Sequence, residues 1–203
     1  MKKIISIAIV TLLSLSLFTA CDGNIPEEDL TLSSVLYDYT FTLDGDSITL
    51  PLTLKEFQEM GWELPSNSTL PEIIEGHTRL LVPRFVKNGK EISIDLINLN
   101  ENDVPMNQAI IFQITSSLDY DNPAVIELPK GIILGKSSKN DVIKVFGGPT
   151  SFGEGDDGIT GLYYISENFG LSGGIWGPSA NQIKITTNKR NIIEEIRIQN
   201  IGK

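Results

Sequence analysis

The sequence predicts an α+β fold, in which two repeats of a short helix pack on an antiparallel β-sheet and a cleaved signal helix precedes them. Three observations support this prediction. Several segments alternate apolar and polar residues with a period of two, which is typical of half-buried strands. Two short segments, near Thr53 and Ser138, combine helix-capping residues with apolar residues at helical spacing. They lie about 85 residues apart and similar strand patterns follow each, which indicates a repeated unit.

The first twenty residues have the three parts of an export signal. Lys2 and Lys3 give a positive start, an apolar run extends to Phe18, and small residues precede Cys21. A permanent membrane helix needs about 20 apolar residues, and this run is shorter. We therefore expect residues 1–20 to be a signal peptide that is removed.

Cys21 is the last residue of the segment Leu17-Phe18-Thr19-Ala20-Cys21, which resembles the lipobox of bacterial lipoproteins. The resemblance implies that a diacylglyceryl group with palmitate-type chains is attached to the Cys21 sulfur and that the chain is cleaved before Cys21. An ordinary secreted protein with a free thiol is the alternative. Because Cys21 is the only cysteine, the lipidated protein would have no disulfide and no thiolate metal ligand. The expected location is the extracytoplasmic face of the cell membrane, with the lipid bilayer as one partner.

The mature chain is acidic. The sequence has 16 basic and 26 acidic residues, and the signal contains two of the lysines, so 14 basic residues face 26 acidic ones after cleavage, a net charge of −12. This charge argues against a nucleic-acid partner and against adhesion of the protein surface to anionic lipid headgroups. Residues 21–35 are polar and acidic, and we expect a flexible tether there.

The first predicted unit spans residues 36–120 and begins with a hairpin. Residues 37–43 alternate apolar and polar side chains, Asp44-Gly45 is a turn dipeptide, and residues 47–50 form the return strand. Folded structure is therefore expected to begin just before this hairpin.

A capped helix follows the hairpin. Thr53 precedes Glu56 by three residues, as in a capping box, and Gly61 is a natural stop. Asn88-Gly89 between apolar runs is a strong hairpin pattern. The strands predicted around and after this turn are residues 79–86, 91–99 and 109–115.

The second predicted unit spans residues 121–203. Ser137 or Ser138 caps a helix that has Asp141 near its start and Gly147 at its end. Strands are predicted at residues 162–165, 182–187 and 192–199.

Residues 135–149 (GKSSKNDVIKVFGGP) are similar to a stretch in one superfamily. Its members are the small outer-membrane-assembly lipoproteins of the SmpA/OmlA type and the tandem-repeat β-lactamase inhibitory protein (BLIP-like). The resemblance implies a helix packed on an antiparallel sheet, and a role in protein–protein contact rather than catalysis. It assigns no residue of this chain to a partner.

Catalytic and metal-binding patterns are sparse. His77 is the only histidine, no G-x-S-x-G elbow accompanies it, and we expect a solvent-facing loop histidine rather than a catalytic base. A zinc site with several histidines is excluded by the same count. The acidic groups are interpreted as turns, with a weak calcium site at Glu154 to Asp157 as the alternative for the last group. These groups are Asp44/Asp46, Asp119/Asp121 and Glu154/Asp156/Asp157.

The candidate contact residues lie in a glycine-rich stretch and are Phe169, Ile175 and Trp176. Trp176 is either an exposed anchor for a partner or, as burial of aromatics favours, a cover for the sheet. Trp62 is expected in the core. The predicted function is a membrane-anchored, non-catalytic module that binds a protein or a cell-envelope ligand, without cofactor or metal. The alternative is a small cell-envelope hydrolase that uses carboxylates.

Overall fold

The computed structural model describes residues 33–155, 158–168 and 180–202, and its main feature is an antiparallel sheet of nine strands. Seven of these strands follow one another across the sheet in the order β12-β13-β14-β15-β9-β7-β5, while β3 pairs with β9 and β6 pairs with β7. Their bounds are β3 Leu52–Thr53, β5 Arg79–Leu81, β6 Phe85–Lys87, β7 Lys90–Ile97, β9 Ile110–Ser117, β12 Ser151–Glu154, β13 Thr160–Asn168, β14 Ala180–Thr187 and β15 Ile193–Gln199.

A second sheet has four strands in the order β11-β10-β1-β2, and β4 pairs with β8 in a small third sheet. The helical segments of the described residues are two α-helices and three 3-10 helices. The strands are β1 Thr40–Leu43, β2 Asp46–Thr49, β4 Ile73–Ile74, β8 Val104–Pro105, β10 Ile126–Leu128 and β11 Ile132–Ile133, and the helices are η2 Ser33–Asp38, α1 Leu54–Glu59, η3 Met106–Gln108, η4 Pro129–Gly131 and α2 Lys139–Phe146.

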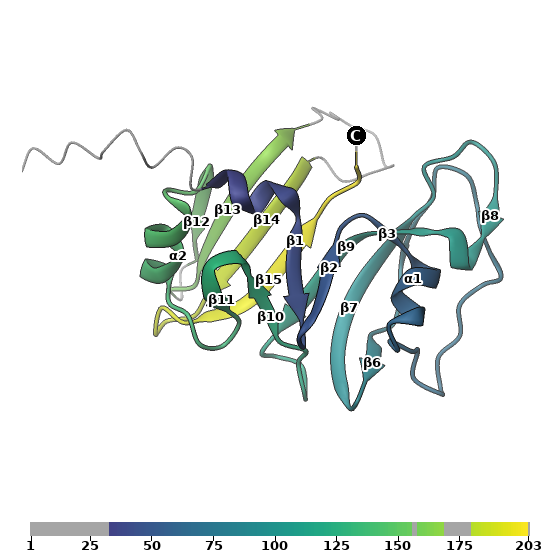
Figure 1. The fold of residues 1–203 in the computed structure, drawn as a ribbon, viewed down its shortest axis with the longest axis horizontal. Coiled ribbons are helices and arrows are strands. Elements are labelled where there is room, and N and C mark those ends of the chain that lie inside the picture. The colour runs from purple at the N-terminus through teal and green to yellow at the C-terminus, as the bar shows by residue number, and fades with distance from the viewer. Residues whose placement is uncertain (1–32, 156–157, 169–179, 203) are drawn as a thin grey trace, which may run out of the picture.

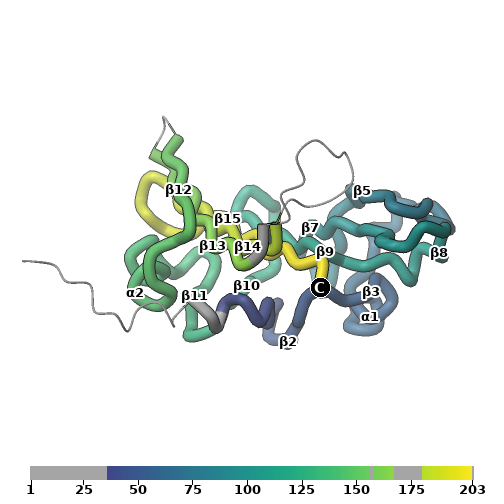
Figure 2. Tube along the Cα trace, turned by 90° about the horizontal axis from the view of Figure 1, so that it is seen from above, coloured from purple at the N-terminus to yellow at the C-terminus, as the bar shows by residue number. Residues whose placement is uncertain are grey.

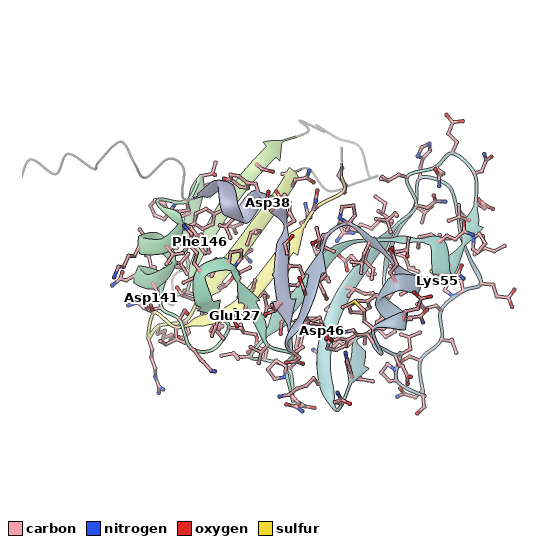
Figure 3. All side chains as sticks on the ribbon, in the orientation of Figure 1. Asp38, Asp46, Lys55, Glu127, Asp141 and Phe146 are labelled. Atoms are coloured by element: carbon pink, nitrogen blue, oxygen red, sulfur yellow. The ribbon has the colours of Figure 1, made fainter. Side chains whose placement is uncertain are left out.

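The four-stranded sheet, α1 and α2 all lie on the same side of the nine-stranded sheet (Figures 1 and 2). Apolar side chains from all these elements form one core. Phe57 and Trp62 stack at 5.5 Å between ring centroids, and Trp62 is fully buried as expected. Phe146 lies on the side of α2 that faces the sheet and meets the Tyr164 ring edge-on (Figure 3). One side of the large sheet is therefore covered by packed structure.

Both α-helices begin with the capping boxes that the sequence predicts. The Thr53 side chain accepts a hydrogen bond from the Glu56 amide, and the Glu56 carboxylate accepts one of 2.7 Å from the Thr53 amide. Ser138 and Asp141 make the same reciprocal pair, so Ser138 rather than Ser137 is the cap of α2. These pairs satisfy amide groups that the first helical turn leaves without a partner.

The two predicted hairpin turns are also present. Asp44-Gly45 joins β1 to β2, and Asn88-Gly89 joins β6 to β7. The first residue of each turn has a positive φ, 49° at Asp44 and 51° at Asn88. Asparagine and aspartate tolerate this conformation because their side chains are short and polar. The strand predicted at residues 79–86 is interrupted, because Pro83 has no amide hydrogen to donate to a sheet.

The predicted fold class, an α+β fold of two repeats with a helix on an antiparallel sheet, is wrong. Strands account for 47% of the structure and helices for 15%, and the described part of the chain has only two α-helices, of six and eight residues. Gly61 and Gly147, at the helix ends, stop both helices after about two turns. Six short strands that the sequence did not indicate, β3, β4, β8, β10, β11 and β12, enlarge the sheets. The molecule is mostly β.

Strands from the two predicted units are hydrogen-bonded to each other in both larger sheets. In the nine-stranded sheet β15 pairs with β9, with Ile198 opposite Ile114. In the four-stranded sheet β1 pairs with β10, with Leu43 opposite Ile126. The division of the chain between residues 120 and 121 stays a prediction.

Candidate binding face

The side of the nine-stranded sheet that faces away from α1, α2 and the four-stranded sheet is polar. Successive side chains of a strand point to opposite sides of a sheet. Ile183 and Ile185 of β14 and Ile196 and Ile198 of β15 point into the core. The residues between them therefore point the other way. We call this side of β12, β13, β14, β15, β9, β7 and β5 the open face.

Strand register aligns the residues of the open face in three rows across the sheet. Each neighbour in a row is a direct partner on the adjacent strand. The central row is Ser151, Tyr163, Lys184, Arg197, Thr115 and Ser93. The flanking rows are Gly153, Gly161, Thr186, Glu195 and Ser117 on one side, and Ile165, Gln182, Gln199, Gln113, Asp95 and Leu81 on the other.

A charged group occupies the middle of the open face. The Glu195 Oε1 atom lies 3.5 Å from Lys184 Nζ and 3.6 Å from the Arg197 Nη2 atom. These distances are within ion-pair range but are too long for hydrogen bonds. The three side chains are 22–37% exposed, so each is partly withdrawn from water. Glu195 therefore attracts Lys184 and Arg197 electrostatically, but these two contacts are not hydrogen bonds.

Buried polar atoms without a hydrogen-bond partner are concentrated on the open face. The described residues have five such side-chain atoms, and four of them are on this face. They are Thr115 Oγ1, Thr186 Oγ1, Glu195 Oε1 and Arg197 Nε. The fifth, Trp62 Nε1, lies in the core. A buried polar group without a partner costs about 1–3 kcal/mol, so folded proteins keep few of them.

Two glycines leave a low area beside Tyr163. Gly153 and Gly161 are partners across β12 and β13. A Cβ atom at Gly161 would lie 3.1 Å from Cε2 of Tyr163 and 3.4 Å from its hydroxyl oxygen, so the Tyr163 ring extends along β13 over Gly161. A Cβ atom at Gly153 would meet nothing within 4 Å. The Lys184 Nζ atom lies 5.9 Å from the centre of the Tyr163 ring.

Paired charges border the open face at β7. The Arg79 guanidinium lies 2.6 Å from an Asp95 carboxylate oxygen, which also accepts a 2.8 Å hydrogen bond from Gln113. Arg84 pairs with Glu91 at 3.0 Å.

Arg84 also stacks on an aromatic ring at this border. Its guanidinium lies 3.8 Å from the centre of the Tyr120 ring. Burial raises the pKa of the Tyr120 hydroxyl, while Arg84 beside it acts in the opposite direction. Tyr120 is thus held on one side by Arg84, whereas Tyr163 has no guanidinium stacked on it.

The open face is close to electrical balance although the chain is strongly acidic. Its basic residues are Arg79, Arg84, Lys184 and Arg197, and its acidic partners are Glu91, Asp95 and Glu195. Three of the four arginines of the sequence are therefore on this side of the sheet. Arginine and tyrosine are over-represented at binding surfaces because both offer large contact areas together with hydrogen-bonding groups.

His77 lies in an exposed loop before β5, as the sequence predicts, with φ of 52° and its backbone amide donating to the Asn100 carbonyl at 3.0 Å. The described residues contain no group of three or more His, Cys, Asp or Glu side chains arranged to hold a metal ion. Asp44 accepts a hydrogen bond from the Val125 amide, and Asp46 pairs with Lys87 at 2.5 Å, so both have structural partners at their turn.

The predicted lipidation and contact residues, and part of the last acidic group, lie outside the described part of the chain. This applies to Cys21, Phe169, Ile175 and Trp176, and to Asp156 and Asp157 of the last acidic group. The residues of the open face were not predicted as a site. The alternation of polar residues in β13, β14 and β15 was the available indication, because it showed that one side of the sheet is not apolar.

Comparison with protein-family models, with curated proteins and with solved structures finds no match to this chain. The similarity of residues 135–149 to the SmpA/OmlA and BLIP-like superfamily therefore stays a prediction. Within the residues that the structure describes, no helix is long and apolar enough to span a membrane.

Proposed function

We propose that the protein is a membrane-anchored extracytoplasmic lipoprotein that acts as a non-catalytic binding module, and that the open face is its binding surface. The observation that carries the proposal is the row of aromatic and charged side chains, Tyr163, Lys184 and Arg197, that strand register aligns on this one side of the sheet. These side chains are partly exposed, and tyrosine and arginine are over-represented among the residues that contribute most to binding.

The size of the open face suits a protein or an extended ligand better than an enclosed small molecule. Its central row crosses six strands, and strands lie about 4.8 Å apart, so the row is about 24 Å long. That length is comparable to one side of a standard protein interface, which covers about 800 Å² per partner.

Two surface depressions on the described residues are small. One, of about 230 Å³, lies over β1 and β10, and another, of about 320 Å³, lies beside the turn between β14 and β15. Two carboxyl groups of the described residues, Glu56 and Asp141, have pKa values that are lowered by hydrogen bonds at helix N-termini. A general acid of a hydrolase needs an upward shift. Neither Glu56 nor Asp141 therefore has the property that the acid of a hydrolase requires.

The anchor is tested at Cys21. Cells grown with an alkyne analogue of palmitate should label the wild-type protein, and the Cys21→Ser variant should lose both the label and membrane association. Labelling of the variant at the wild-type level would contradict the lipoprotein assignment.

The binding surface is tested by retention of envelope material on the immobilised mature protein. The K184A/R197A variant removes two positive charges from the open face and should lose a component that the wild type retains. The matched control, K55A/R190A, removes two exposed positive charges from α1 and from the turn between β14 and β15, and should retain it. Equal retention by both double variants would contradict the proposed surface.

A further inference from the structure

We infer that two copies of this chain associate edge to edge through β12, so that their nine-stranded sheets join into one continuous sheet. The inference goes beyond the proposed function, because it concerns a second surface of the molecule and a second copy of the chain as partner.

β12 is the outermost strand of the nine-stranded sheet and lies at the same end of the molecule as α2 (Figures 1 and 2). It pairs with β13 on one side, and no strand of the described residues pairs with its other side. All of its residues are exposed, and the Phe152 side chain is 65% exposed. β12 therefore forms an accessible sheet edge.

The hydrogen bonds between β12 and β13 show which backbone groups this edge offers. Just beyond the strand, the Gly155 amide donates to the Ile159 carbonyl at 2.8 Å. Antiparallel partners alternate between pairs that exchange hydrogen bonds and pairs that do not. In the same register, Gly153 bonds to β13, whereas the amides and carbonyls of Phe152 and Glu154 point outward. Another extended strand is the natural complement of such donors and acceptors.

Nothing in the sequence of β12 blocks the approach of a further strand. Edge strands are commonly protected by lysine, by proline or by a bulge that bends the strand away. The sequence of β12, SFGE, has neither lysine nor proline, and its register with β13 has no shift. The edge is therefore open along the whole strand.

β12 is complementary to a second copy of itself. In antiparallel pairing about a twofold axis at Gly153, Gly153 lies opposite Gly153 of the second copy, and Phe152 lies opposite Glu154 of the second copy. Both copies then use their outward backbone groups. A Cβ atom at Gly153 would meet nothing within 4 Å, so the centre of the pairing has room. The axis is perpendicular to the sheet, so the open faces of both copies lie on the same side.

The charges at this edge also select the pairing centred on Gly153. Glu154 lies 3.8 Å from Lys139 of α2 and is on the same side of the sheet as Phe152. Like charges directly opposite each other destabilise strand pairs. Pairing centred on Glu154 would bring two carboxylates together, whereas pairing centred on Gly153 places each carboxylate opposite a Phe152 ring.

The pairing is tested by cross-linking in membranes of cells that express the full chain. In a pair without hydrogen bonds the Cα atoms lie about 4.5 Å apart, which a disulfide can bridge, so Gly153→Cys should give a covalent dimer on mild oxidation. Ser47→Cys, an exposed change on the four-stranded sheet, is the control and should stay monomeric. The wild type, whose one cysteine is lipidated in the proposed function, should also stay monomeric.

Sedimentation equilibrium of the purified protein in detergent tests the same register without a new thiol. Gly153→Lys places two positive charges opposite each other and should weaken the dimer by about fivefold. Ser151→Lys, on the same strand and the same side, is the matched control. Its two lysines would be about 13 Å apart along the strands, so it should dissociate within about twofold of the wild type.

The absence of a cross-link through Gly153→Cys, equal cross-linking through Ser47→Cys, or equal weakening by the two lysine variants would overturn the inference. Thermal unfolding shows whether each variant is folded, and the cross-link alone decides if Gly153→Lys does not fold. A cross-link in the wild type would mean that Cys21 is a free thiol, which contradicts the proposed anchor. Gly153→Cys in a Cys21→Ser chain then decides the pairing.

Discussion

The phenolic hydroxyl of Tyr164 donates a hydrogen bond of 3.0 Å to the carbonyl of Gly147, and this bond ties the end of α2 to β13. Gly147 has φ of 75°, which only glycine adopts at little cost, and it ends the helix. The last carbonyls of a helix have no partner within the helix. Tyr164 supplies a hydrogen-bond donor for the Gly147 carbonyl. The Tyr164 side chain is fully buried, and burial raises the pKa of its hydroxyl.

The variant Tyr164→Phe should therefore be less stable. It leaves the Gly147 carbonyl buried without its donor and should lower the free energy of unfolding by about 1–3 kcal/mol. Urea unfolding followed by circular dichroism measures this change. Tyr163→Phe, on the open face of the same strand, is the matched control and should change stability by less than about 0.5 kcal/mol. Equal losses in the two variants would show that the Tyr164 bond has no special role.

The capping box of α1 gives a prediction that depends on pH. Hydrogen bonds from Thr53 lower the pKa of Glu56 below its ordinary value of 4.5. Because the folded pKa is lowered, the stabilisation from Glu56 is present above pH 4.5 and is lost as the pH falls through the folded pKa. Thr53→Ala should cost about 1 kcal/mol near neutral pH.

The measurement is urea unfolding of wild type, Thr53→Ala and Glu56→Ala at neutral pH and at about pH 3. The advantage of the wild type over Glu56→Ala should shrink at the lower pH. Gln58→Ala, an exposed and uncharged change in the same helix, should show the same difference from the wild type at both pH values. An advantage that grows on acidification would mean that the carboxylate is not the form that caps the helix.

The capping boxes and the hairpin turns could be predicted because each is encoded within a few residues. Thr53 with Glu56, and Asn88 with Gly89, act through bonds between near neighbours or through backbone conformations that few residues adopt. The short strands could not be predicted in this way. Strands of two residues, such as β3 and β11, have no period to detect, and they exist because a distant strand offers hydrogen bonds.

The open face could not be predicted because it depends on register between distant strands. Thr115 and Arg197 are direct partners although 82 positions separate them, and nothing local in either strand indicates the other. The sequence instead drew attention to Cys21 and Trp176, which are conspicuous by residue type. A polar residue between two isoleucines is common in strands. Its place in a polar surface can be recognised only once the strand register is known and polar residues of neighbouring strands are seen to lie side by side.

The pair of Arg79 and Asp95 allows a prediction about a buried charge. The Asp95 side chain is 8% exposed and its carboxylate oxygen receives Arg79 at 2.6 Å and Gln113 at 2.8 Å. Arg79→Ala leaves the Asp95 carboxylate buried with Gln113 as its one neutral donor. The free energy of unfolding should fall by about 1–3 kcal/mol. This loss is smaller than that for a fully buried ion pair, because Arg79 is 39% exposed.

The double variant R79A/D95N removes the charge that lacks a partner and should recover part of the lost stability. Urea unfolding of the wild type, both single variants and the double variant gives the coupling between the two residues. Strict additivity of the two single changes would mean that the ion pair contributes nothing.

Tyr120 should make the stability sensitive to alkaline pH. Burial raises the pKa of its hydroxyl above the ordinary value of 10.0, because the phenolate would lose hydration at a half-buried site. A raised folded pKa means that the stabilisation is fully present below pH 10 and is lost as the pH rises through the folded value. Tyr120→Phe has no proton to lose. The difference in unfolding free energy between wild type and Tyr120→Phe, measured from about pH 8 to about pH 11, should therefore move in favour of the variant. A constant difference over this range would show that the Tyr120 hydroxyl has the same pKa in the folded and the unfolded chain. It would then follow that this hydroxyl stays hydrated beside Arg84 in the folded protein.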